Sequence, residues 1–333
     1  MSELAVAMYA AETGSHLLAA PHYGRFEAFR RQFDEPGCRN GLAERLLRFV
    51  GRSEASYPGR LRSVHDPPIG LFVRGNAELQ VLDQPCVAVV GARACSSYGT
   101  EVAVTLGREL ARAGVVVVSG LARGVDGAAH RGALETGVTV AVLGCGIDRD
   151  YPSTHAALAA LITTRGLIVS EYAPGVEPAP WRFPARNRIV AGLADATVVV
   201  EARARSGALI TADLALEEGR EVLAVPGEIT SNLSAGTNEL LRLGAIPVTS
   251  AADVLAVLGI EPAPPPAAIP RESLSPEAQA LAAAVADSPL TFDELIHRSG
   301  LEPAVVSATL VELELLGLVR ESDGVYRAVM PPA

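Results

Sequence analysis

The 333-residue sequence predicts an α/β protein whose main domain contains a doubly wound parallel sheet. Short runs are wholly apolar, as in Val115 to Val118, which is what a strand buried on both faces requires. From Cys86 onward such runs alternate with helical stretches, and glycine-rich turns lie between them. This alternation indicates an extended Rossmann-like sheet with all its strand carboxyl ends along one edge. Strands are expected at residues 69–74, 87–90, 115–119, 139–143, 167–170, 197–200, 221–225 and 245–248, and helices near 98–113, 125–136, 153–164, 208–219, 234–243 and 250–258.

The first 57 residues predict a small helical module of the SAM-like kind, which precedes a main core at residues 58–260. The module lacks the glycine-rich hairpin that DNA-binding modules of this size use, so a scaffold or interaction role is expected. Residues 66–68 (Asp-Pro-Pro) lead into the core and cannot be helical. The helices of the module are expected at residues 3–10, 14–21, 27–33 and 42–50.

Residues 261–270 form a proline-rich linker, and residues 271–333 predict a winged-helix module. Three helices (276–286, 291–298 and 303–316) precede a hairpin with an Asp-Gly turn at residues 323–324. The third helix of such a module usually reads DNA in the major groove. Here the module holds four arginines and ten acidic residues, and Glu302, Glu312 and Glu314 lie on or beside the third helix. Because this surface repels phosphates, we expect contact with a protein instead.

Composition excludes several classes of protein. No apolar run is long enough to span a bilayer, and the amino terminus does not resemble a signal peptide, so a cytoplasmic protein is expected. The four cysteines lie far apart and form no C-x-x-C pair, which argues against a structural zinc site. All 28 basic residues are arginine, which excludes a lysine-containing Walker loop. No cofactor is predicted, and phosphate binding would use arginine and backbone N–H groups.

Turns at the predicted strand ends carry the residues suited to anion binding. Gly91 and Arg93 follow one strand, and Gly120 and Arg123 follow the next. Glycine allows a close approach of the backbone, and the amino terminus of the following helix offers unpaired N–H groups. Ser206 with Gly207 makes a third such turn, as a helix cap or an anion ligand. Each turn also has a plainer interpretation, as a tight turn with its arginine in solvent, but together they favour a ligand with several phosphates.

The segment from residue 181 to residue 192, read as a loop, places three arginines close together in a chain with a formal net charge of −10. Guanidinium groups bind phosphates through paired hydrogen bonds, and an exposed ring of Phe183 could stack on a base. The alternative is that the arginines serve solubility and that Phe183 belongs to the core. The other residues considered for the groove are Arg186, Asn187 and Arg188.

Four acid–base residues keep a catalytic hypothesis open. Asp126 and His130 lie one helical turn apart, and Glu171 and Glu201 follow predicted strands. The plainer interpretation makes Asp126 a helix cap and His130 structural, since no nucleophile lies near them in the sequence. The catalytic alternative is a nucleotide-processing hydrolase, such as a nucleoside-monophosphate phosphoribohydrolase, on the same fold.

The ordered motifs VVGARACSSYG, SGLARGVDGAAH, FPARNRIVAGL and VVEARARSGALITA resemble the DNA-processing protein A family, also called DprA or Smf. The resemblance covers roughly residues 58 to 258. It implies a recombination mediator that binds single-stranded DNA, protects incoming strands in natural transformation and loads the recombinase RecA. It also implies a homodimer without a catalytic step. A regulator that reads DNA through the winged helix is a third possibility.

The resemblance also assigns residues. It implies DNA binding by Gly91, Arg93, Ser119, Gly120, Phe183, Arg186, Asn187 and Arg188, to which the strand-edge argument adds Arg123, Ser206 and Gly207. It implies pairing and recombinase contacts near Leu240, Leu241 and Ile246. The sequence departs from the family where Ala92 replaces a common serine and where His155 replaces a frequent asparagine.

Overall fold

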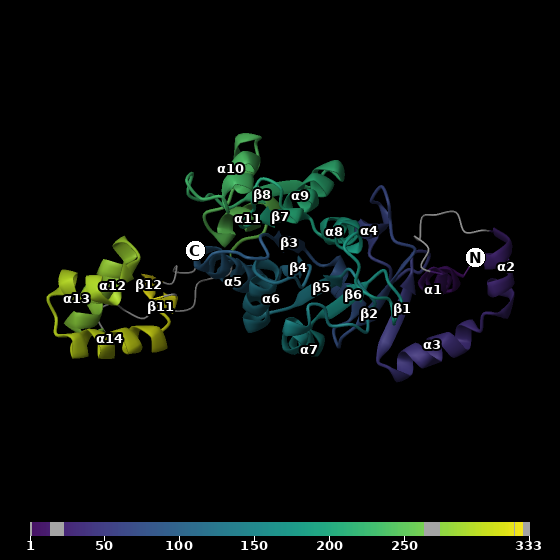
Figure 1. Ribbon diagram of the computed structural model, residues 1–333, viewed down its shortest axis with the longest axis horizontal. Helices are drawn as coiled ribbons and strands as arrows, with labels where there is room; N and C mark the ends of the chain where they lie inside the picture. Colours follow the sequence, from purple (N-terminus) through teal and green to yellow (C-terminus); the bar gives the residue numbers. More distant parts are fainter. Residues whose placement is uncertain (1, 14–22, 263–273, 323, 329–333) are drawn as a thin grey trace. The chain divides into compact units, whose positions relative to one another are not determined.

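A computed structural model describes residues 2–13, 23–262, 274–322 and 324–328. The chain divides into two compact units, residues 1–262 and 263–333 (Figure 1). The first unit contains a nine-stranded mixed sheet and the second a three-stranded sheet. Most of the proline-rich segment at 261–270, and the helix expected at 14–21, lie outside the described residues.

The amino-terminal helices pack at one end of the large sheet (Figure 1). The helix expected at residues 42–50 is wrong in its second half, because residues 47–51 form a strand. The preceding helix ends at Glu44, and Leu46 has a positive φ of 56°, which turns the chain out of the helix. The ring of Phe49 then packs against Phe72 of the next strand, with 4.8 Å between ring centres. The elements are α1 (Glu3–Thr13), α2 (Tyr23–Gln32), α3 (Glu35–Glu44), β1 (Leu47–Gly51), α4 (Gly59–Arg62) and β2 (Gly70–Arg74).

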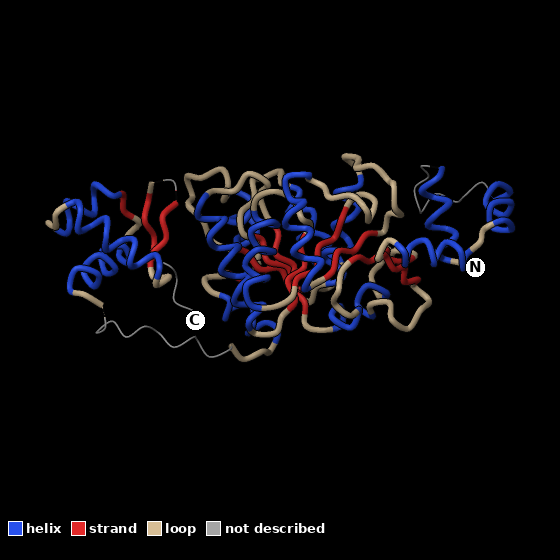
Figure 2. Tube along the Cα trace, turned by 90° about the horizontal axis from the view of Figure 1, so that it is seen from below, coloured by secondary structure: helices blue, strands red, loops and turns tan. Residues whose placement is uncertain are grey.

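The parallel core confirms the predicted fold class. Its strands, drawn in red in Figure 2, have the order β1-β2-β6-β5-β4-β3-β7-β8-β9, and the pairings show that all neighbours from β6 to β9 are parallel. β3 lies between β4 and β7, so the chain winds outward from it in two directions. In such sheets the ligand binds in a crevice outside the strand carboxyl ends, at the position where the strand order reverses. The strands are β3 (Cys86–Val90), β4 (Val116–Ser119), β5 (Thr139–Leu143), β6 (Leu167–Ser170), β7 (Ala196–Val199), β8 (Glu221–Ala224) and β9 (Ile246–Pro247).

Helices cover both faces of this sheet, which explains the wholly apolar strands. In β3, Val87 and Val89 belong to one apolar cluster, and Ala88 and Val90 belong to the other. The first cluster includes side chains from α5, α6 and α11, and the second from α4, α8, α9 and α10. The helices are α5 (Ser97–Arg112), α6 (Val125–Thr136), α7 (Ala156–Arg165), α8 (Arg182–Leu193), α9 (Gly207–Glu217), α10 (Ala235–Arg242) and α11 (Ala251–Leu258), with short 3-10 turns η1 (Leu79–Asp83) and η2 (Ser153–His155).

The basic segment at residues 181–192 forms the helix α8, and the expectation of a loop was wrong. Pro184 occupies the first turn, where a missing backbone N–H costs no helical hydrogen bond. Ile189, Val190 and Leu193 are buried against the sheet and hold the helix in place. Its arginines therefore project from a rigid element.

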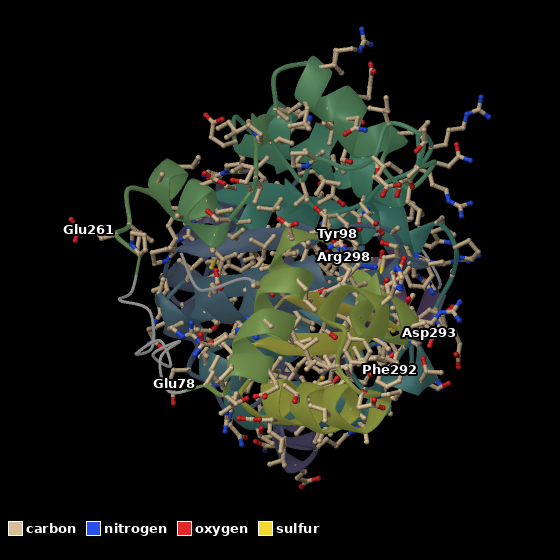
Figure 3. All side chains as sticks on the ribbon, turned by 90° about the vertical axis from the view of Figure 1, so that its left-hand side faces the viewer. Glu78, Tyr98, Glu261, Phe292, Asp293 and Arg298 are labelled. Atoms are coloured by element: carbon tan, nitrogen blue, oxygen red, sulfur yellow. The ribbon has the colours of Figure 1, made fainter. Side chains whose placement is uncertain are left out.

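The second unit has the predicted winged-helix order. The strands pair as β10-β12-β11, and an apolar cluster joins them to the three helices. A capping box between Thr291 and Glu294 starts the second helix, and Gly300 ends it in the left-handed conformation. Figure 3 labels Phe292, Asp293 and Arg298 of this helix. The elements are α12 (Pro276–Asp287), β10 (Leu290–Thr291), α13 (Phe292–Ser299), α14 (Pro303–Leu315), β11 (Val319–Ser322) and β12 (Val325–Ala328).

Candidate nucleic-acid interface

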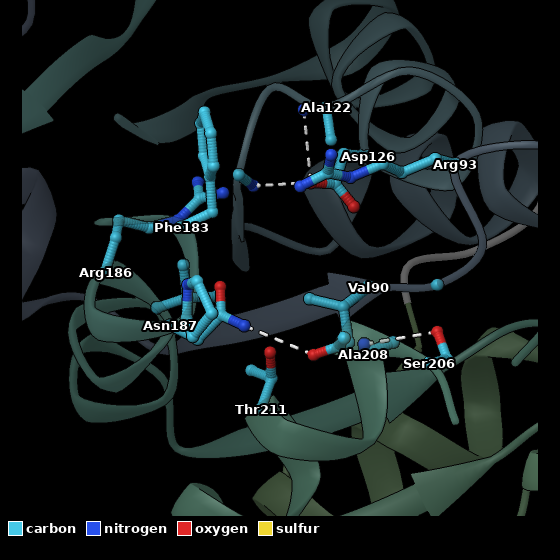
Figure 4. Close-up of a pocket in the computed structure, with 15 residues that line it drawn as sticks. Val90, Arg93, Ala122, Asp126, Phe183, Arg186, Asn187, Ser206, Ala208 and Thr211 are labelled. Carbon is cyan, nitrogen blue, oxygen red and sulfur yellow. Dashed lines mark hydrogen bonds between the residues drawn. The ribbon is translucent and has the colours of Figure 1, made fainter. Parts of the chain in front are cut away.

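Two adjoining cavities open at the strand carboxyl ends, close to β3, where the order of the strands reverses. Their volumes are about 280 Å³ and 140 Å³, and both are lined by Arg93, Gly120, Ala122, Phe183 and Arg186. We call this continuous depression the strand-end groove. Figure 4 shows its larger part, with walls from the β3 and β4 turns, from α8 and from the start of α9. The other lining residues are Val90, Gly91, Asp126, Pro184, Asn187, Val190, Ser206, Gly207, Ala208 and Thr211 in the larger part, and Arg123, Tyr151, Pro152 and Thr154 in the smaller part.

Arg186 forms the floor of the groove. Its side chain is only 4% exposed, and its guanidinium donates a hydrogen bond to the carbonyl oxygen of Val142. A Cβ atom at Gly120 would lie 2.3 Å from Nη1 of Arg186, so glycine is needed for the guanidinium to pack against this turn. Burial lowers the pKa of Arg186, the carboxylate of Asp126 opposes this, and the nearby cation of Arg93 lowers it further. The floor thus concentrates positive charge in a place where water is scarce.

Asp126 braces the turn after β4. Its Oδ2 accepts backbone hydrogen bonds from Gly120 at 3.1 Å and Ala122 at 3.2 Å. Burial raises the pKa of this carboxyl group, while Arg186 and the two N–H groups act in the opposite direction. The carboxylate therefore holds the shape of the β4 turn and partly balances Arg186.

A stacked pair of rings and a cation lie at the boundary between the two cavities. Tyr151 stacks on Phe183 with 5.3 Å between ring centres and 27° between planes. The guanidinium carbon of Arg93 lies 5.3 Å from the centre of the Phe183 ring. Among the described residues, Arg93 and Arg123 make none of the ion pairs, and both side chains are exposed. Exposed guanidinium groups beside an aromatic surface can bind a phosphate and a base together.

The amino terminus of α9 forms the third wall. The hydroxyl of Ser206 caps the helix by accepting from the backbone N–H of Ala208 at 3.3 Å. Asn187 donates from Nδ2 to the carbonyl oxygen of Gly207 at 3.2 Å, which ties α8 to α9 (Figure 4). The positive end of the α9 dipole adds to the arginines and favours an anion here.

Comparison with known proteins decides the family. The family model described as DNA recombination-mediator protein A matches residues 48–259, and the DprA winged helix domain matches residues 261–324. The chain belongs to the DNA recombination-mediator protein A family. This confirms the resemblance read from the sequence motifs, and it places the protein among DNA-binding proteins of recombination.

The similar proteins include the DNA processing protein DprA of Streptococcus pneumoniae, which is 48% identical over 201 residues, 60% of this chain and 70% of that protein. The X-ray structure of DprA from Streptococcus pneumoniae matches with a TM-score of 0.65 at 39% identity, covering 78% of this chain and 92% of that one. The structure of DNA processing protein A from Helicobacter pylori, described by its single-stranded DNA binding mode, matches with a TM-score of 0.56 at 35% identity, covering 61% of this chain and 92% of that one.

Within this family member, two residues expected to bind DNA lie away from the strand-end groove. Ser119 is fully buried, and its hydroxyl donates to the carbonyl oxygen of Val89 at 2.7 Å. Arg188 pairs with Glu171 at 2.5 Å and with Asp66 at 2.8 Å. Residues two apart on a helix point in different directions, so Arg188 cannot share the groove with Arg186. The nine expected residues that line the groove are Gly91, Arg93, Gly120, Arg123, Phe183, Arg186, Asn187, Ser206 and Gly207.

Sequence reasoning missed Tyr151. The ring is 42% exposed and lies about thirty residues from Phe183 in the chain, so only the fold brings the two rings together. A lone tyrosine before a proline gives no sequence signal for a base-stacking site. Thr154 and Thr211, which also line the groove, were missed for the same reason.

The acid–base candidates are engaged in internal hydrogen bonds. His130 is fully buried with Nδ1 2.7 Å from Oγ1 of Thr139, and burial lowers the pKa of His130 to about 3. Glu201 accepts from the backbone N–H of Ser96 at 2.9 Å and from its hydroxyl at 2.5 Å. Glu171 pairs with Arg188, which leaves Asp126 as the one member of the set that lines the groove.

The three residues expected near a dimer or partner surface are buried or partly buried within the chain. Leu240 is 8% exposed and belongs to the core, while Leu241 and Ile246 are partly buried against it. The side of α10 that carries Leu240 packs on the sheet. The exposed apolar side chains of this region are Leu243, at 71%, and Ile229, at 95%.

Two further observations concern the described residues alone. No three His, Cys, Asp or Glu side chains among them gather closely enough to hold a metal ion. None of the described helices combines the length and the apolar character needed to cross a membrane.

Proposed function

We propose that the strand-end groove binds single-stranded DNA and that the protein protects such strands and delivers them to a recombinase. The observation that carries the proposal is the joint placement of Arg93, Arg123 and Arg186 around the ring of Phe183. Three guanidinium groups suit successive phosphates of one strand better than a single phosphate. The structure of the Helicobacter pylori relative, described by its single-stranded DNA binding mode, supports this ligand.

The stacked rings favour a single strand over a duplex. Bases paired in a duplex are stacked on each other and cannot lie on Phe183 or Tyr151, whereas a single strand offers the face of each base. The guanidinium of Arg93 lies over Phe183, and Arg123 and Arg186 line the same cavity as the two rings. A strand that follows the groove can therefore place a base on the rings and its phosphate at Arg93.

We propose that the protein acts without a catalytic step. A hydrolase needs an acid or base that can reach the ligand, and His130, Glu171 and Glu201 are held by Thr139, Arg188 and Ser96. Asp126 faces the groove, but two backbone N–H groups and Arg186 hold its carboxylate in place. A purified sample that released free base from nucleoside monophosphates, and lost that activity in Glu201→Gln, would contradict this proposal.

We further propose that the protein is cytoplasmic, forms a homodimer, and meets the recombinase RecA through the region that contains α10. Leu243 and Ile229 are exposed there, and large exposed apolar side chains at the surface favour contact with another protein. Loading of a recombinase requires that the strand and the partner be held at once. A surface beside α10, formed by residues that do not line the groove, satisfies that requirement.

The decisive experiment compares a labelled oligothymidine with a duplex of equal length by fluorescence anisotropy at several salt concentrations. Tighter binding of the single strand, weakening steadily as salt rises, is expected. The same titration on residues 1–262 should give the same single-strand affinity, because the groove lies wholly in that unit. Loss of binding in the shortened chain, or tighter binding of the duplex, would overturn the assignment.

A further inference from the structure

The third helix of the winged-helix module, α14, is apolar on both of its sides. Val306, Leu310 and Leu313 point inward and are at most 2% exposed. On the opposite side, Val311 is 52% exposed and Leu315 is 84% exposed. A helix that is apolar all round is normally buried on all sides. The outer side of α14 therefore has the composition of a surface that another element covers.

The outer apolar residues form a straight line along the helix. They recur at intervals of four, three and four residues, which places them on one face. The line extends over twelve residues, a rise of about 16.5 Å at 1.5 Å per residue. We call it the α14 outer stripe, and it consists of Ala304, Ala308, Val311 and Leu315, all exposed.

Acidic side chains border the α14 outer stripe on both sides. On a helical projection Glu312 lies about 80° to one side of Ala304 and Glu314 about 80° to the other, at 100° per residue. Both are exposed, and they are the charged residues of α14, which carries no cation. Among the described residues, no ion pair involves a side chain of this second unit.

The charge pattern indicates which kind of molecule covers the α14 outer stripe. Nucleic acid and anionic lipid are repelled by the two glutamates, which lie where a DNA-reading helix would carry cations. Two copies of the stripe packed together would bring four glutamates to one interface, and like charges there cost stability. A helix with an apolar line bordered by lysine or arginine matches both features, since apolar side chains cover the stripe while cations meet the glutamates.

We propose that the α14 outer stripe docks a basic amphipathic helix of a partner protein, with Val311 and Leu315 as apolar anchors and Glu312 and Glu314 as charge contacts. The winged helix thus serves as a protein adaptor, tethered to the DNA-binding unit by the proline-rich segment. Single-stranded DNA binding by the other unit does not depend on this surface. The proposed docking site and the proposed DNA-binding groove can therefore be tested independently.

The test measures the binding of three synthetic 16-residue helical peptides to the full chain by isothermal titration calorimetry. The first peptide has a leucine and alanine stripe bordered by lysine, the second has the same stripe bordered by glutamate, and the third keeps the lysines but has serine in the stripe. Binding of the first peptide at least ten-fold tighter than either of the others is expected. Equal binding of the first and third would show that net charge alone attracts the peptide, and would overturn the proposal.

Variants of the chain locate the contact. Val311→Ser with Leu315→Ser, and separately Glu312→Gln with Glu314→Gln, should each weaken the first peptide at least ten-fold. The charge-matched control, Asp287→Asn with Asp293→Asn, removes two exposed acids outside α14 and should leave binding within two-fold. Because all these residues are exposed, thermal midpoints should stay at the value of the unmodified chain, and the glutamine pair tests the surface even if the serine pair is destabilised.

Two further outcomes would contradict the proposed occupant. Sedimentation that shows self-association of the full chain, lost in the serine pair, would identify a second copy of this chain as the occupant. Binding of a labelled duplex that is lost in the serine pair would identify DNA. Unchanged sedimentation and unchanged single-strand binding in that variant are expected.

Discussion

The guanidinium of Arg93 lies over the ring of Phe183, with 5.3 Å between its central carbon and the ring centre. Arg93 belongs to the turn after β3 and Phe183 to the first turn of α8, so the contact joins two walls of the strand-end groove. In the proposed function, the β3 turn supplies the phosphate contact and α8 supplies the surface for a base. Because the two side chains lie together, the proposal has a single nucleotide contact both. The dependence of DNA affinity on salt concentration then separates the contribution of the charge from that of the ring.

Replacement of Arg93 by alanine should weaken single-strand binding by about ten- to a hundred-fold, since a charge-assisted hydrogen bond contributes about 1.5–3 kcal/mol. The slope of log affinity against log salt should fall by about 0.7, the value for one phosphate contact on a single strand. Anisotropy at several NaCl concentrations measures both. The control Arg30→Ala removes an exposed arginine of α2 that pairs with Glu27, and it should change neither. An unaltered slope in Arg93→Ala would remove Arg93 from the site.

Replacement of Phe183 by alanine should weaken binding by about 1–3 kcal/mol, which is the stacking contribution of one base, while leaving the salt slope unchanged. A ring contributes through its face and carries no charge, which is why affinity and slope separate. Phe183→Tyr keeps the face and should bind within about two-fold of the unmodified protein. A salt slope that changed in Phe183→Ala would mean that the ring acts by positioning Arg93.

Arg186 and Arg188 lie two residues apart on α8, but their alanine variants should have different effects. Arg188→Ala removes the partner of Glu171, which is 4% exposed, so it should lower the free energy of unfolding by about 3–5 kcal/mol. Arg186→Ala should reduce single-strand affinity as well as stability, because its guanidinium forms the groove floor and partly balances the buried carboxylate of Asp126. Thermal unfolding and anisotropy on both variants separate these effects. A stable Arg188→Ala protein that no longer binds DNA would show that the sequence expectation was right and that the ion pairs open on binding.

The buried His130 should make stability depend on pH. Burial lowers the pKa of His130 to about 3 in the folded chain, whereas an unfolded histidine titrates near 6.5. Between these values the unfolded state holds the extra proton, so this contribution to stability is complete above about pH 6.5 and is lost as pH falls. The slope should approach about 1.4 kcal/mol per pH unit from this residue alone. Urea unfolding of His130→Asn, which keeps a donor toward Thr139, should show a flatter dependence from pH 6.5 to 4.5. An identical slope would mean that His130 is charged in the folded protein.

Pairing through the region of α10 should depend on Leu243. Leu243→Glu places a charge where an apolar contact is proposed, so light scattering should report a monomer at concentrations where the unmodified chain is a dimer. Leu161→Glu changes a comparably exposed leucine, 57% exposed on α7, and should leave the dimer intact. A monomeric unmodified chain, or a dimer that survives Leu243→Glu, would contradict the proposed interface.

The sequence by itself determined the order of strands and helices in the parallel core, apart from α8, and about half of the groove lining. Wholly apolar runs such as Val115 to Val118 can only be buried on both faces, and this dictates a sheet covered by helices on two sides. Parallel strands then bring Gly91, Arg93, Gly120 and Arg123 to one edge, because their carboxyl ends share it. Local residue order is enough for this because it fixes which end of a strand a turn follows.

Only the tertiary structure decided which charges remain available and which residues far apart in the chain meet. Nothing near Arg188 in the sequence indicates that Glu171 and Asp66 would pair with it, whereas Arg186 was left at the groove floor. Tyr151 became a groove residue because the fold stacks it on Phe183. The segment at 47–51 became a strand because β2 offered a partner edge. In each case the deciding interaction joins residues distant in sequence, and a pattern read along the chain records neighbours but not the geometry of such contacts.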